Sequence, residues 1–61
     1  MNWTQNTNTL TSVGGKINYK IIKYPDGSAF VVRYGLESTT LPSQKLAIKF
    51  CEKYDKDLGN G

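Results

Sequence analysis

The segment YPDGS at residues 24–28 constrains the fold of this chain most, because it separates two strand-like runs and sets how they face each other. Pro25 presets φ for the first turn position, and Gly27 supplies a residue that takes positive φ readily. The flanking runs, 16–24 and 29–36, are rich in β-branched and aromatic residues. They predict the two strands of a β-hairpin.

The length of the turn decides which side chains share a face of the hairpin. A loop of three residues pairs Tyr24 with Ser28 and places Arg33 on the same face as Ile21. A loop of four residues pairs Tyr24 with Ala29 instead. Because a slip of one residue turns every side chain to the other face, burial selects the register. We expect the loop of four, or a bulge with the same facing, which gives a core face of Ile17, Tyr19, Ile21, Phe30, Val32, Tyr34 and Leu36.

A shorter strand is predicted before this hairpin. Residues 9–13, TLTSV, are mostly β-branched, and Gly14–Gly15 follows at once. Two glycines between strand-like runs predict a tight hairpin turn, since both can take positive φ. Residues 1–8 form a polar N-terminal segment with one large apolar anchor, Trp3.

The last third of the chain predicts a helix over residues 41–58, followed by a tail at 59–61. Thr39 or Thr40 is the expected N-cap, and Pro42 suits a first helical turn that does not need its N–H. Helical spacing collects one apolar stripe: Leu46, Ala47, Phe50, Cys51, Tyr54 and Leu58. The sequence therefore predicts one α+β domain over residues 1–61, a three-stranded antiparallel meander (9–36) packed on one C-terminal helix.

Composition argues against several classes of function. The 61 residues include no histidine and only one cysteine, Cys51, so we expect neither a metal site, nor a cofactor, nor an internal disulfide. Cys51 lies on the apolar stripe with no histidine to activate it, and no spacing brings two carboxylates into one pocket. We therefore expect that the protein is not an enzyme. Neither a secretory pattern nor a membrane-spanning apolar run occurs, which predicts a cytoplasmic protein without a membrane partner.

The face of the sheet away from the helix is the first candidate binding surface. Its predicted members are Lys16, Asn18, Lys20, Ile22, Tyr24, Val31 and Arg33. The cations suit phosphate contacts, whereas the apolar members with a polar rim suit a protein interface. An ordinary solvated face is the third interpretation. The net charge is only +3, and Arg33 is the sole arginine among eight basic residues, which favours a protein partner over sequence-specific DNA recognition.

Two further surfaces follow from the predicted elements. Four lysines step along one flank of the helix, and they are Lys45, Lys49, Lys53 and Lys56. This flank could bind nucleic acid or an acidic protein, or it could simply be solvated. A three-stranded sheet also has two free edges, which allow a partner strand or a second copy to pair there and give a homodimer.

The order of three strands and one helix, with "TTLPSQKLAIKFCEKYD" at the end, resembles AP2-type and phage-integrase arm-binding domains, whose sheets bind the DNA major groove. The stretch "LPSQKLAIKFCEKY" is similar to the last helix of double-stranded-RNA-binding domains. The arginine-rich strands and glycine motifs of AP2 domains are missing, as is the first helix of the RNA-binding domain. The whole pattern resembles small orphan proteins of phages and prophages, which implies a non-enzymatic module that binds and modulates a host protein.

Overall fold

The computed structural model describes residues 1–60, and in this range the chain forms five strands and one helix. The elements are β1 (Asn2–Asn6), β2 (Thr9–Val13), β3 (Tyr19–Lys23), β4 (Phe30–Tyr34), β5 (Glu37–Leu41) and α1 (Gln44–Asn60).

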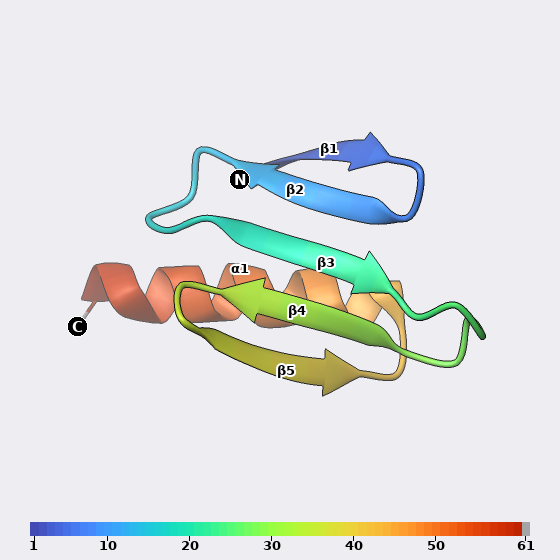
Figure 1. Cartoon of the computed structure of the whole chain (residues 1–61). Helices are drawn as coiled ribbons and strands as arrows, with labels where there is room; N and C mark the ends of the chain where they lie inside the picture. Colours follow the sequence, from blue (N-terminus) through green and yellow to red (C-terminus); the bar gives the residue numbers. More distant parts are fainter. Residues whose placement is uncertain (61) are drawn as a thin grey trace.

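The strands form one antiparallel meander in the order β1-β2-β3-β4-β5, and α1 packs across one face of it (Figure 1). The helix contacts β3, β4 and β5, whereas the β1–β2 hairpin extends beyond the edge of the helix (Figure 1). The α+β class and the C-terminal helix are confirmed, but the predicted number of three strands is wrong.

The register of the central hairpin follows the four-residue loop. The Tyr24 N–H donates to the Ala29 carbonyl at 3.1 Å, and the ladder continues with Ile21 opposite Val32 and Ile22 opposite Val31. Gly27 takes φ 73°, as its place in the turn requires. The Asp26 carboxylate accepts hydrogen bonds from the N–H and hydroxyl of Ser28, which lowers the pKa of Asp26.

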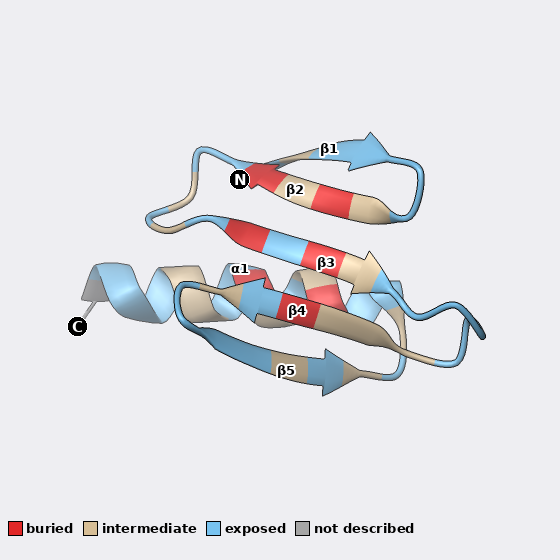
Figure 2. Cartoon of the chain, viewed as in Figure 1, coloured by how far each residue is buried: buried red, intermediate tan, exposed pale blue. Residues whose placement is uncertain are grey.

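The core lies between the helix and the face that this register selects. Its fully buried side chains are Tyr19, Ile21, Val32, Ala47 and Cys51, with Leu10 and Ser12 nearly so. Figure 2 shows a buried, an exposed and a buried position in succession at the start of β3, as expected for a strand covered on one side. Around this core pack Trp3, Ile17, Phe30, Tyr34, Leu41, Ile48, Phe50 and Tyr54.

The prediction that the sheet begins at residue 9 is wrong, because most of the polar segment 1–8 forms strand β1. Asn2–Asn6 pairs with β2 through a turn at Thr7–Asn8. Neither turn residue has positive φ, so this hairpin lacks the Asn-Gly type of signal by which such turns are recognised. Trp3 is half-buried against the core, which gives β1 its apolar anchor.

The expected boundary between sheet and helix is also wrong. Gly35 takes φ 62° and Leu36 lies at the tip of a turn, where it is fully exposed instead of in the core. The chain then returns as β5 (Glu37–Leu41). Consequently neither Thr39 nor Thr40 is the N-cap: Ser43 accepts the Leu46 N–H with its hydroxyl at 3.2 Å.

The Gly14–Gly15 turn is wider than predicted, and residues 14–18 form a loop before β3. Two polar groups hold this loop in place of ladder pairing. The Ser12 hydroxyl accepts the Tyr19 N–H at 2.8 Å, and the Asp55 carboxylate accepts the Lys16 N–H at 2.6 Å. The helix therefore fixes a loop that lies thirty-nine residues away in sequence.

The buried stripe of α1 is rotated from the predicted one. Leu46 and Leu58 are 46% and 41% exposed, while Ile48 packs against the core. The helix also continues through Gly59 to Asn60, so two residues of the predicted tail are helical, and Gly61 lies outside the described residues.

Candidate binding surface: the open face of the sheet

The face of the sheet opposite α1 is open, and strand alternation assigns its members. We call this set the open face; it comprises Asn2, Thr4, Asn6, Thr9, Thr11, Val13, Lys20, Ile22, Val31, Arg33, Ser38 and Thr40.

Two of the cations predicted for this face are direct neighbours. Lys20 lies opposite Arg33 in the β3–β4 ladder, and both side chains are exposed. Hydroxyl residues continue the row on each side, with Thr11 opposite Lys20 and Ser38 opposite Arg33. This row presents two cations and two hydroxyl groups that can all donate hydrogen bonds to an anion.

The adjacent row has an apolar centre. Ile22 lies opposite Val31 in the same ladder, and both side chains are half-buried. Thr9 and Thr40 flank this pair. The branched side chains have one or two accessible χ1 rotamers, so little side-chain entropy remains to be lost when a partner binds.

The open face contains no carboxylate. Asp26 is held in the turn by Ser28, and three of the other four acidic residues lie on α1. The fourth, Glu37, lies on the opposite face by alternation, although it lines a hollow of about 180 Å³ together with Arg33. The charge of the Lys20–Arg33 pair is therefore positive and is not balanced within the face.

The structure places the other predicted members differently. Tyr24 is 42% exposed and follows Ile22 by two residues. Strand alternation therefore places its side chain on the open face, at the end near the turn. Asn18 is exposed in the loop before β3. Lys16 does not belong to this face, since its N–H bonds to Asp55 and its side chain lies against Gly59 at the end of the helix.

The lysine flank of α1 is on the other side of the molecule. All four lysines (Lys45, Lys49, Lys53 and Lys56) are exposed, and helical spacing puts them opposite the buried residues Ala47 and Cys51. Glu52 is also exposed and falls three residues after Lys49 and four before Lys56, so its carboxylate reduces the positive charge of this flank. One flat partner cannot contact this flank and the open face together.

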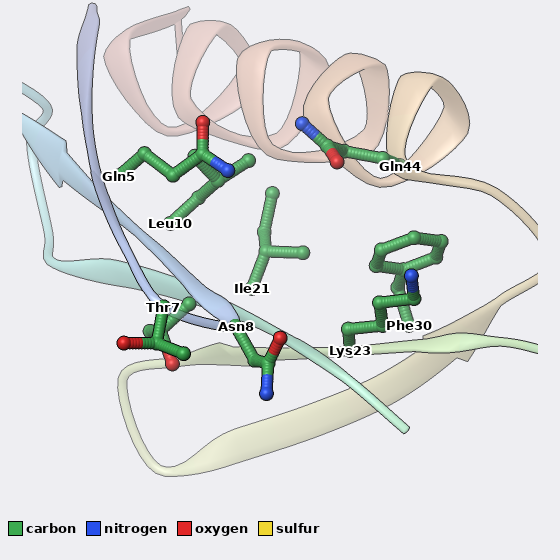
Figure 3. A pocket seen from close by; sticks show the side chains of 9 residues that line it. Gln5, Thr7, Asn8, Leu10, Ile21, Lys23, Phe30 and Gln44 are labelled. Carbon is green, nitrogen blue, oxygen red and sulfur yellow. The ribbon is translucent and has the colours of Figure 1, made fainter. Parts of the chain in front are cut away.

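A small hollow of about 150 Å³ lies where the start of α1 leaves the sheet uncovered (Figure 3). Leu10, Ile21 and Phe30 line it with apolar atoms, and Gln5 and Gln44 extend over it from β1 and α1 (Figure 3). The sequence prediction missed this hollow because it depends on β1, which was not recognised as a strand.

Two ionisable side chains, Tyr19 and Cys51, are buried in the core. Burial and the hydrogen bond from its hydroxyl to Asp55 raise the pKa of Tyr19. Burial, and then the nearby charge of Glu52, raise the pKa of the Cys51 thiol to about 11, so the thiol is protonated at neutral pH and has no solvent access. Within residues 1–60, no three side chains of the metal-binding types come together.

No helix in the described range is long and apolar enough to cross a membrane. Comparison with known proteins adds no relative, since no protein-family model, no curated protein and no solved structure matches the chain.

Proposed function

We propose that this protein is a non-enzymatic binding module whose open face binds an acidic patch on a partner protein. The observation that carries the proposal is the Lys20–Arg33 pair, which has no carboxylate on its own face and lies beside an apolar pair, Ile22 and Val31. A surface with an apolar centre and a charged, hydroxyl-rich surround is typical of protein interfaces.

The cation pair favours an anionic partner. Like charges directly opposite each other across two strands destabilise a sheet by a few tenths of a kcal/mol. Lys20 and Arg33 are such a pair, so the free protein carries a small electrostatic cost. A partner carboxylate placed between them removes that repulsion and accepts charge-assisted hydrogen bonds from both side chains.

A protein partner is favoured over nucleic acid by the number of cations. The open face has two, so a nucleic-acid complex would release few counterions and its affinity would fall with a log–log salt slope of only about −2. The face also lacks an arginine pair for base readout and has only Tyr24, at its end, for stacking. The resemblance to small phage proteins implies that the partner is a host protein.

Paired charge reversals test the proposal. The tagged chain captures partners from a host lysate, and mass spectrometry identifies them. The variant Lys20→Glu/Arg33→Glu is compared with Lys49→Glu/Lys53→Glu, which changes the net charge equally on exposed residues of α1. We expect the first variant to lose the partner and the second to retain it. Equal retention by both variants contradicts the proposal.

Nucleic acid is the second candidate, because the same two cations fit phosphates. Labelled duplex and single-stranded DNA are titrated with the protein at about 50 mM salt and at higher salt. We expect no binding. Binding that Lys20→Glu/Arg33→Glu abolishes would replace the protein partner with nucleic acid, and binding that only the helix variant abolishes would move the function to α1.

A further inference from the structure

The two outermost strands have free backbone edges, and the hydrogen bonds between the inner strands show which residues face outward. The Lys23 N–H donates to the Asn8 carbonyl at 3.1 Å, so Asn8, Leu10 and Ser12 direct their backbone groups toward β3. By alternation, the residues between them face β1. The backbone N–H and C=O groups of Trp3 and Gln5 therefore lie on the free edge of β1, which borders the molecule in Figure 1.

The two edges differ in their protection against pairing. At β5 the same alternation places the backbone groups of Ser38 and Thr40 outward, with the charged Glu37 at one end and Pro42 just beyond the other. Charged residues and prolines are the usual devices that prevent edge pairing. β1 (Asn2–Asn6, NWTQN) has neither, and every residue in it is uncharged.

We propose that β1 pairs with β1 of a second copy of this chain, antiparallel and centred on Thr4. In this register Trp3 of one copy lies opposite Gln5 of the other, and both residues have outward backbone groups. The dimer contains this pair twice, and the two pairs together exchange four backbone hydrogen bonds. Thr4 meets its own counterpart, which is a favourable cross-strand pair, and Asn2 meets Asn6. No like charges meet anywhere along the strand.

The chemistry of β1 selects a second copy because the strand is complementary to itself in this register. The twofold axis runs perpendicular to the sheet, so both helices lie on one side and both open faces on the other. Five strands of five residues cover about 400 Å², roughly half of what a standard interface buries on each partner. Two joined sheets therefore offer one continuous surface of the usual size. The inference rests on the strand edge and not on the proposed partner.

The first experiment measures the mass of the purified full chain in solution from micromolar to millimolar concentration. We expect a shift from one chain to two. Gln5→Pro removes an outward N–H without touching the β1–β2 ladder, and it should weaken dimerisation by about tenfold to a hundredfold, because each copy loses a donor. Thr40→Pro makes the matched change on the β5 edge and should leave dimerisation unchanged. Circular dichroism confirms that both variants fold.

The second experiment tests the register. Facing residues in a pair without hydrogen bonds are about 4.5 Å apart between Cα atoms, which is within the range for a disulfide. Thr4→Cys should therefore form an intermolecular disulfide under mild oxidation, whereas Thr40→Cys should not. The native Cys51 is fully buried and does not compete. A chain that stays monomeric at all concentrations, or dimers that Thr40→Pro disrupts and Gln5→Pro does not, would overturn the proposal.

Discussion

Ile21 and Ile22, and likewise Val31 and Val32, are neighbours of the same residue type on opposite faces of one sheet. Ile21 and Val32 are almost completely buried under α1, whereas Ile22 and Val31 are half-buried on the open face. In the ladder between β3 and β4, Ile21 lies opposite Val32 and Ile22 lies opposite Val31. The difference shows that the loop of four residues, through the register it sets, decides which methyl groups stabilise the fold and which are available to a partner.

The largest expected difference between the two faces is in packing. Val32→Ala should lower the free energy of unfolding by about 2 to 3 kcal/mol, because it removes two buried methyl groups and leaves a cavity. Val31→Ala, the matched change on the open face, should cost less than about 1 kcal/mol. Urea unfolding of both variants measures the contrast. Equal losses would show that the open face is covered as well.

Alkaline pH should lower the stability of the fold through two buried groups on the helix-covered side. Burial raises the pKa of Cys51 from an ordinary 9 to about 11, so the unfolded chain loses this proton first. The corresponding stability is complete below pH 9 and is lost as pH rises through 11. The free energy of unfolding should therefore fall by about 2 kcal/mol over that window.

Tyr19 adds to this loss above pH 10, because burial and the Asp55 hydrogen bond raise its pKa as well. Urea unfolding at increasing pH measures both effects. The variant Cys51→Ala should remove the decline between pH 9 and 10 and reduce it above pH 10, and Tyr19→Phe should reduce only the part above pH 10. A wild-type decline that persists in the double variant would place the titrating groups elsewhere.

Charge on the open face should oppose stability slightly. Lys20→Thr removes the repulsion with Arg33 and adds a β-branched residue to a strand, so it should raise the free energy of unfolding by up to about 0.5 kcal/mol. The wild type should gain a similar amount when salt screens the pair. Thermal unfolding at low and high salt compares the two chains. A loss of stability in Lys20→Thr would mean that the cations are balanced within the protein.

Two opposing effects that largely cancel are expected at Trp3, where β1 meets the core. Its indole N–H is buried and has no hydrogen-bond partner, and an unsatisfied buried donor costs free energy. Trp3→Phe removes this donor together with some apolar contact, so we expect a change of less than about 1 kcal/mol in either direction. Trp3→Ala, which removes the contact entirely, is the comparison. A loss as large as that of Trp3→Ala would show that the indole N–H finds a partner in solution.

The sequence allowed the central hairpin to be predicted because its turn residues and its alternation agree. The Pro25–Gly27 turn sets the register, and the side chains of Tyr19, Ile21 and Val32 fit only one face. Lys20, Ile22, Val31 and Arg33 were assigned to the open face on the same basis. Their direct pairing across the ladder follows from that register.

The remaining elements could not be predicted because their signals are weak or distant. The Thr7–Asn8 turn has no glycine, and Pro42 was interpreted as part of a helix although it follows a strand. The bond from Lys16 to Asp55 joins residues far apart in sequence. Without β1 and β5, the threonine-rich sides of the open face were also missed.

The most direct test of the two-faced sheet is methyl NMR of the chain labelled at isoleucine and valine, with and without the captured partner protein. We expect that the partner shifts the methyl signals of Ile22 and Val31 and leaves those of Ile21 and Val32 in place. Shifts confined to Ile48 of α1, or equal shifts of the neighbouring residues, would contradict it.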